Sequence, residues 1–128
     1  MTFYCTHCWR EVQQTATVCP HCGDDIAARQ AHADYTDKLI GALHHPEPTT
    51  PIRAAWILGQ RRERKAVAPL CELARESNDA FIAESAVNAL GAIGDARARD
   101  TLRWAANCSQ PRLRAAAREV LKKVPATL

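Results

Sequence analysis

Aromatic residues are scarce in this chain, and long apolar runs are absent. Only 5% of the 128 residues are Phe, Trp or Tyr, although 47% are hydrophobic. A core of small aliphatic side chains with few rings favours helices packed closely on helices. No apolar run approaches the roughly 20 residues that span a bilayer, and the first cysteine motif already begins at Cys5. We therefore expect no membrane segment, no signal peptide and a cytoplasmic location.

A strong charge excess is also missing. The 17 Lys and Arg residues exceed the 14 Asp and Glu residues by only three. Dedicated nucleic-acid binders concentrate more positive charge on one surface. The weak excess lies in residues 31–128, because residues 1–30 hold two basic and three acidic side chains. Charge alone therefore selects no class of partner.

The cysteines, in contrast, form a pattern typical of a metal site. Cys5-Thr-His-Cys8 and Cys19-Pro-His-Cys22 are two C-x-x-C motifs separated by ten residues. In a reducing compartment, paired thiols bind metal more often than they form disulfides. Each short turn directs two thiolates to one point, and four thiolates suit tetrahedral Zn(II). The spacing predicts one structural Zn(II) ion with a closed shell of Cys5, Cys8, Cys19 and Cys22.

Residues 11–18, between the motifs, alternate β-branched and polar side chains and predict a short hairpin. Residues 4–26 resemble the short double-C-x-x-C zinc ribbons at the head of many prokaryotic proteins, and Cys19-Pro-His-Cys-Gly23 matches their second knuckle. The first knuckle departs from the family, because Trp9 stands where glycine is usual. Either this turn differs or a bulky ring lies at its tip, where it packs on the protein or anchors a partner. His7 and His21 are expected to point outward from their turns.

The rest of the chain contains an internal repeat. Ile52–Gly59 and Glu84–Gly91 share an alanine-rich pattern that ends in Leu-Gly, and the same offset relates Leu70 to Leu102 without a gap. A period of this length predicts a solenoid of stacked helix pairs. We expect about two and a half repeats, with Thr50, Ser109 and Asp79 near helix starts and Gly94 at a helix end. The expected helices are 36–45, 51–59, 68–76, 80–91, 96–107 and 111–123.

The segment Glu84–Asp95 resembles the phycobilisome-lyase type of HEAT-like repeat, whose alanine-rich helix ends in Leu-Gly-x-Ile-Gly-Asp. The resemblance covers roughly residues 37–124. It implies a mainly α protein, a short α-solenoid of HEAT-like pairs behind a small N-terminal β zinc ribbon. The expected domains are the ribbon at 1–26, a linker or connecting helix at 27–36 and the repeats at 37–124. Members of this family are either scaffolds that bind proteins or enzymes that attach bilins, so the fold alone does not choose.

Two surfaces are candidates for a partner. A basic ridge is predicted in the turns between paired helices, where it either docks phosphates or an acidic protein or caps helix C-termini. A mixed face on the second helices, with Glu72 and Trp104, suits a protein better than a nucleic acid. Trp56 is expected in the core, as are the thiols of Cys71 and Cys108. The candidate partner residues are Trp9, Arg61, Arg62, Arg64, Lys65, Arg97, Arg99, Arg103 and Trp104, and Lys122 and Lys123 extend the ridge.

No catalytic motif is visible, and the predicted metal shell leaves no open position. The sequence is therefore interpreted as a non-enzymatic adaptor that binds a protein, with no membrane partner and no evident small-molecule substrate. The alternative is a nucleic-acid or ribonucleoprotein-associated protein that uses the basic ridge and the ribbon. A third hypothesis, a lyase-like helper for a cofactor-bearing protein, rests on the family resemblance alone. The ribbon, or a partner, is expected to cap the exposed end of the first helix.

Overall fold

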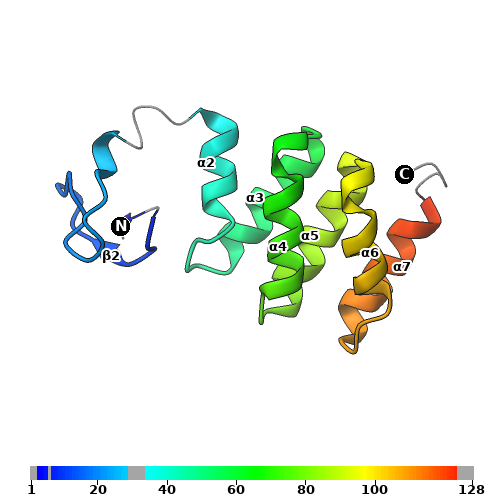
Figure 1. Cartoon of the computed structure of the whole chain (residues 1–128). Coiled ribbons are helices and arrows are strands. Elements are labelled where there is room, and N and C mark those ends of the chain that lie inside the picture. Colours follow the sequence, from blue (N-terminus) through cyan, green and yellow to red (C-terminus); the bar gives the residue numbers. More distant parts are fainter. Residues whose placement is uncertain (1–2, 6, 29–33, 124–128) are drawn as a thin grey trace.

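The structure is a computed structural model that describes residues 3–5, 7–28 and 34–123. A small N-terminal unit contains strands β1 (Phe3–Tyr4) and β2 (Glu11–Val12), which pair antiparallel. A row of helices follows (Figure 1). Their bounds are α2 Tyr35–Ala42, α3 Thr49–Gln60, α4 Val67–Glu76, α5 Ala80–Ile93, α6 Arg99–Ala106 and α7 Pro111–Lys123. The mainly helical solenoid with a small N-terminal sheet is confirmed. Among the described residues, no helix is long and apolar enough to cross a membrane.

Helix boundaries follow local capping chemistry. The Asp79 carboxylate accepts from the amides of Phe81 and Ile82 at the start of α5, and Gly94 ends this helix in the left-handed conformation, as predicted. The predicted cap at Thr50 is wrong, because α3 begins one residue earlier and Pro48 precedes it without a side-chain cap. At α7 the side-chain oxygen of Gln110, not Ser109, accepts from the first amides of the helix.

Two short 3-10 turns, η1 (Arg64–Ala66) and η2 (Ala96–Ala98), lead into α4 and α6. The sequence pattern predicted one continuous helix from residue 96, but α6 itself begins at Arg99. Asp95 accepts from the amide of Arg97 and so starts the tighter turn. The predicted connection at 27–36 lies partly outside the described residues, which stop at 28 and resume at 34.

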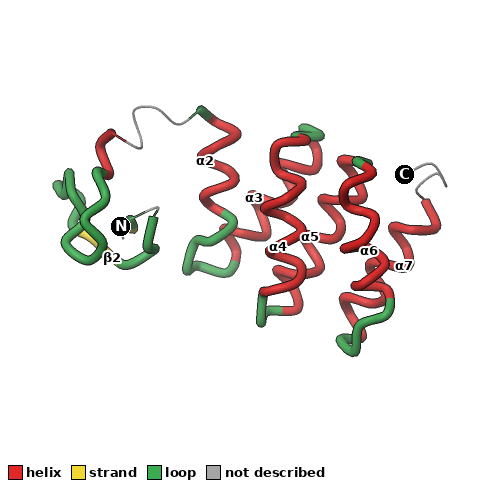
Figure 2. The backbone as a smooth tube through the Cα atoms, in the orientation of Figure 1, coloured by secondary structure: helices red, strands yellow, loops and turns green. Residues whose placement is uncertain are grey.

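The helices pair differently from the expectation. Helix α2 packs on α3, α4 on α5 and α6 on α7, whereas α3 makes little contact with α4, which follows it in the chain. The stack therefore holds three helix pairs, not two and a half, and Arg61–Lys65 lies between successive pairs. The second helices are α3, α5 and α7, and they pack on one another more closely than α4 and α6 do. Figure 2 shows the short loops that close each pair.

Glycine makes this close second-helix layer possible. A Cβ atom on Gly59 would lie 3.0 Å from the Ala89 Cα, and one on Gly91 would lie 2.7 Å from a Val120 methyl. Both glycines lie inside helices and neither has a positive φ, so their role is close approach. The core of α3 is correspondingly small, with Ala54, Ala55 and Leu58 fully or almost fully buried.

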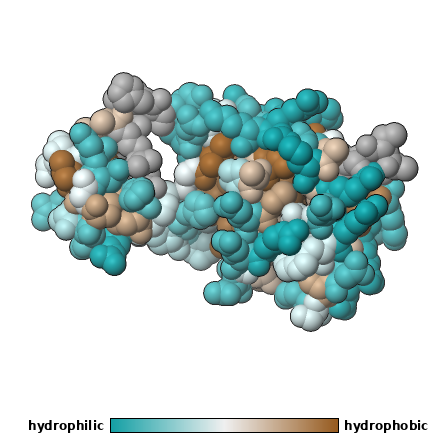
Figure 3. Space-filling view, viewed as in Figure 1, coloured by the Kyte–Doolittle hydropathy of each residue, from teal (hydrophilic) through white to brown (hydrophobic). Residues whose placement is uncertain are grey.

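The two ends of the stack are finished differently. At the C-terminal end, Arg118 of α7 donates to the carbonyl oxygen of Ala106, the last residue of α6, and Arg114 donates to that of Cys108, which follows α6. These guanidinium groups satisfy carbonyls that the end of α6 leaves without a helical partner. At the other end the N-terminal unit lies beside α2 (Figure 1). The surface seen in Figure 3 is mostly hydrophilic, with apolar patches over the middle of the stack and on the N-terminal unit.

Candidate metal centre and docking surfaces

The two C-x-x-C motifs fold into matching turns. In the first, the His7 amide donates to the Cys5 sulfur at 3.4 Å, and in the second the His21 amide donates to the Cys19 sulfur at the same distance. The amide four residues after each leading cysteine then bonds back to that cysteine's carbonyl, from Trp9 at 2.7 Å and from Gly23 at 3.0 Å. Both imidazoles are exposed, consistent with turn residues that point outward.

These turns bring the four predicted sulfur ligands together. The Sγ atoms of Cys5, Cys8, Cys19 and Cys22 all lie within 4.8 Å of one another. The Cys5–Cys22 and Cys8–Cys19 sulfur distances are both 3.7 Å, too long for disulfides. A tetrahedral ion with metal–sulfur bonds of about 2.3 Å separates its sulfurs by about 3.8 Å. The cluster can therefore hold one metal ion with little movement.

The thiols ionise unevenly in the absence of a cation. Burial opposes ionisation of Cys19, but the amides of Cys22 and His21 and the neighbouring thiols outweigh it and lower the pKa of Cys19 to about 6. At Cys22 the Asp24 amide lowers the pKa, yet burial and the adjacent sulfurs together raise it to about 12. One thiolate therefore forms easily and opposes the ionisation of its neighbour. A bound cation removes this conflict, because it stabilises all four thiolates at once.

Trp9 has the left-handed backbone conformation that Gly23 has at the equivalent position of the second turn. Its φ is +60°, beside +77° at Gly23 in the second turn, so the turn is unchanged and the ring lies at its tip. This conformation costs a non-glycine residue about 1 kcal/mol. The indole packs edge-on against the His45 imidazole with ring centroids 5.5 Å apart, and Tyr4 packs on the same imidazole at 4.8 Å. The metal turn therefore touches the loop between α2 and α3. The role of Trp9 as an anchor for a partner stays a prediction.

About half of the predicted basic ridge is paired with carboxylates. Lys65 contacts Asp37 at 2.6 Å and Asp34 at 3.5 Å, which raises the pKa of Lys65, and the Asp37 amide with Lys65 lowers the pKa of Asp34. Arg61 contacts Glu63 at 3.2 Å. In the next repeat, Arg97 contacts Asp95 at 3.0 Å and donates to the Arg64 carbonyl at 3.2 Å. The remaining members are Arg62, Arg64 and Arg99, all beside these turns, and Lys122 contacts Glu119.

The predicted mixed face lies on the first helices, α4 and α6, because the pairing differs from the expectation. Glu72 and Arg103 are exposed, and the Trp104 side chain is 38% exposed with the Arg75 guanidinium 5.3 Å from its ring centroid. Cys71 and Cys108 are partly buried and pack against the apolar core, close to what was expected of them.

The prediction that Trp56 lies in the core is wrong, since its side chain is 64% exposed. The buried stripe of α3 runs through Pro51, Ala54, Ala55 and Leu58, and Trp56 follows Ala55 by about 100° around the helix. The spacing of residues 51, 54, 55 and 58 in the sequence was a readable signal of this arrangement.

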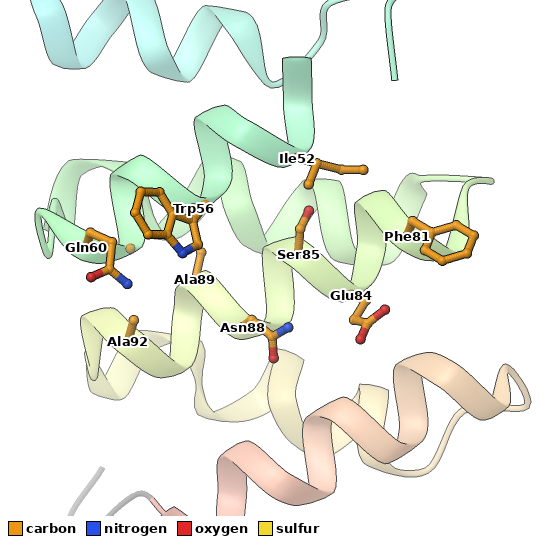
Figure 4. A pocket seen from close by; sticks show the side chains of 10 residues that line it. Ile52, Trp56, Gln60, Phe81, Glu84, Ser85, Asn88, Ala89 and Ala92 are labelled. Atoms are coloured by element: carbon orange, nitrogen blue, oxygen red, sulfur yellow. The ribbon is translucent and has the colours of Figure 1, made fainter. Parts of the chain in front are cut away.

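Trp56 borders a groove between α3 and α5 with a volume of about 500 Å³ (Figure 4). This Trp56 groove is lined by residues that the sequence analysis did not single out, including Ile52, Gln60, Phe81, Glu84 and Asn88. Residues 52, 56 and 60 share one face of α3 at intervals of four. A second hollow, toward α2, is lined by Leu39, Arg53 and again Trp56. The Trp56 indole therefore lies between two hollows, one between α3 and α5 and the other between α2 and α3.

Comparisons with known proteins agree with this architecture. The family of HEAT repeats matches residues 36–122, the span from α2 almost to the end of α7. A search of curated proteins finds no match. The family match is to HEAT repeats in general, and the lyase-like type that residues 84–95 resemble stays a prediction. By its repeats, its helix pairs and this match, the chain belongs to the HEAT-repeat family.

Proposed function

We propose that this protein is a non-enzymatic, protein-binding adaptor. It docks its partner on the exposed side of the second helices α3, α5 and α7, which we call the second-helix face. HEAT repeats generally act as scaffolds for protein interaction, and a stacked repeat offers a continuous surface for this purpose. The observation that supports the proposal most directly is the exposed indole of Trp56 between two hollows. Tryptophan is among the residue types most enriched in side chains that dominate binding energy at interfaces.

In this proposal the N-terminal ribbon holds one structural Zn(II) ion. Four sulfurs at tetrahedral spacing suit zinc, and a closed shell leaves no position for water or substrate. The ion stabilises the ribbon, and the ribbon in turn covers the end of the stack through Tyr4, Trp9 and His45. The free cysteines suit a reducing compartment, which favours the cytoplasm.

Nucleic-acid binding receives less support from the structure. Phosphate binding needs cations that can release counterions along one surface. Arg61, Lys65 and Arg97 each contact a carboxylate instead. The paired turns therefore favour a protein partner over a nucleic acid.

The test is affinity capture from the native cell with matched variants. The wild-type chain is expected to retain a specific set of proteins, and Trp56→Ala is expected to reduce their recovery roughly tenfold or more, as for a central interface residue. Trp104→Ala is the matched control, because it removes an exposed indole from the other layer. Cys19→Ser shows whether recovery needs the metal.

Equal recovery with Trp56→Ala and the wild type would reject the second-helix face as the docking surface. Loss of all captured proteins after nuclease treatment would favour the nucleic-acid alternative. Capture at low and at moderate salt distinguishes protein binding from nucleic-acid binding, because phosphate binding weakens steeply with salt.

A further inference from the structure

Three of the four exposed aromatic rings in the described repeats have an arginine guanidinium over the ring. The Arg61 guanidinium lies 5.0 Å from the Tyr35 ring centroid, and Arg75 lies 5.3 Å from that of Trp104. Arg112 lies 4.3 Å from the Phe81 ring centroid. A guanidinium over an aromatic face is attracted by the ring quadrupole. Cation–π contacts with arginine therefore recur along the stack.

Trp56 is the exception. It is the most exposed of these four rings, and no cation or ring among the described residues contacts it. The repeat explains the difference. Phe81 and Arg112 occupy equivalent positions of two successive second helices, whereas the position equivalent to Trp56 on the next second helix is Asn88. The asparagine side chain is too short to stack on the indole, so the ring stays open to a partner.

The polar groups near this ring can accept hydrogen bonds. The side-chain amides of Gln60 and Asn88 line the Trp56 groove, are exposed and make no hydrogen bond within the described residues. The lining of the groove also includes the Glu84 carboxylate, which Arg112 already contacts, and no lysine or arginine. The nearest cation of α3, Arg53, lines the hollow on the α2 side. The free acceptors near the indole are therefore the amide oxygens of Gln60 and Asn88, which suit a group that donates hydrogen bonds.

Figure 4 shows how these groups are arranged. Gln60 on α3 lies beside the Trp56 indole and Ala89 on α5 lies across from it, while the Asn88 amide, further along α5, points away from the ring and Phe81 lies at the far end. At the Phe81 end, a ring, a guanidinium and a hydrogen-bond acceptor already lie together. Arg112 covers the Phe81 ring and also donates to the Glu84 carboxylate. The open end near Trp56 has the ring and the acceptors but lacks the arginine.

We propose that the Trp56 groove binds an arginine side chain of a protein partner, stacked on the indole from the α5 side and donating to the amide oxygens of Asn88 and Gln60. This inference rests on the proposed function and names the chemistry of its partner. Arginine fits better than lysine, because a planar guanidinium stacks on a ring and presents several donors in one plane. The apolar residues Ile52 and Ala92 extend the groove on either side for neighbouring side chains.

The first experiment uses a phage-displayed library of random dodecapeptides. The library is selected on the zinc-loaded full chain and depleted on Trp56→Leu, which keeps an apolar side chain but removes the ring. Trp104→Leu is the matched control for depletion. Peptides that need Trp56 but not Trp104 are expected to be enriched in arginine above the frequency in the unselected library.

The second experiment tests the charge itself. One selected peptide is synthesised with its arginine and with citrulline, which is neutral and has nearly the same shape. Binding is followed by NMR through the three indole N–H signals, with Trp56 assigned from Trp56→Phe. The citrulline peptide is expected to bind roughly 2- to 5-fold more weakly, the range of an exposed cation over an aromatic ring. The arginine peptide is expected to shift the Trp56 signal most.

Three outcomes would overturn this inference. They are Trp56-dependent peptides enriched in Asp or Glu, equal binding of the arginine and citrulline peptides, and no Trp56-dependent peptide at all. None of them rejects the proposed function, which fails only if protein capture from the cell is independent of Trp56. Thermal melts of Trp56→Leu confirm that a loss of binding does not reflect unfolding.

Discussion

The ribbon and the helical stack are stabilised in different ways. Within the described part of the ribbon, the buried cluster consists of Cys5, Cys19 and Ile26, with a few partly buried neighbours. The stack has one continuous buried cluster from Leu39 to Ala117. The apolar core of the ribbon is too small to offset the entropy of folding. Units of this size depend on metals or disulfides. From this comparison we predict that the ribbon depends on a bound ion, whereas the stack depends on close packing of its second helices.

Metal removal is expected to have the largest effect and to separate the two regions. Chelation, or Cys19→Ser, should unfold residues 3–28, because metal binding supplies about 10–16 kcal/mol to structural zinc units. The helical signal in circular dichroism should stay largely intact, since the helices of the stack lie in residues 35–123. Residue-resolved NMR provides the measurement, and Cys71→Ser is the control thiol outside the cluster. Collapse of both regions together would show that the stack has no stability of its own.

Crowding the second-helix layer is expected to destabilise the stack alone. In Gly91→Ala the new methyl would overlap the methyl groups of Val120, at 2.7 and 2.9 Å. Overpacking of this kind costs about 1–3 kcal/mol, which exceeds the gain in helix propensity. Gly41→Ala is the matched control, because no atom lies near its new methyl group, and it should stabilise by about 0.5 kcal/mol. Urea unfolding measures both, and a stabilised Gly91→Ala would contradict the close packing.

The ring contacts of Tyr4 and Trp9 with His45 should make the stability of the stack depend weakly on the folded ribbon. Each ring pair contributes about 0.5–1.5 kcal/mol beyond its buried area. Chelation should therefore lower the melting temperature of the stack by about 5 °C in the wild type. In His45→Ala the same treatment should change it little, because the rings of Tyr4 and Trp9 have lost their partner. The same decrease in both proteins would show that the ribbon does not act through His45.

The smallest effect concerns acid and the turn before α6. The side chain and amide of Arg97 lower the pKa of Asp95 to about 2 from its ordinary value of 3.8. A depressed carboxyl pKa stabilises the fold above the ordinary value, and this contribution is lost as the pH falls toward the lowered one. The difference in stability between the wild type and Asp95→Asn should thus shrink from pH 5 to pH 2. Metal-free protein is used for both, because acid protonates the thiolates.

A constant difference across this pH range would assign the stabilisation to the turn geometry instead of the charge. Asparagine is a suitable replacement, since it also caps helix starts. Urea midpoints at pH 5, 3 and 2 suffice for the comparison.

Much of this architecture could be predicted from local patterns. The C-x-x-C spacing identified the four sulfurs, because a two-residue turn leaves little freedom in where they point. The regular offset between the Leu-Gly copies identified the stack, since alanine and leucine at helical spacing leave one apolar face to bury. Helix ends at Gly94 and Asp79 followed from backbone conformation and capping. These are properties of short segments.

The tertiary structure decided which helices pair and what each surface contains. A repeat period is the same whether α3 pairs with α2 or with α4, so the sequence alone placed Trp56 and Trp104 on the wrong layers. Only the packed helices show how closely α3 approaches α5 at Gly59, and that Arg112 lies over the Phe81 ring while Asn88 leaves Trp56 open. The physical reason is that these contacts join segments a whole repeat apart in the sequence, and their geometry depends on how closely entire helices approach.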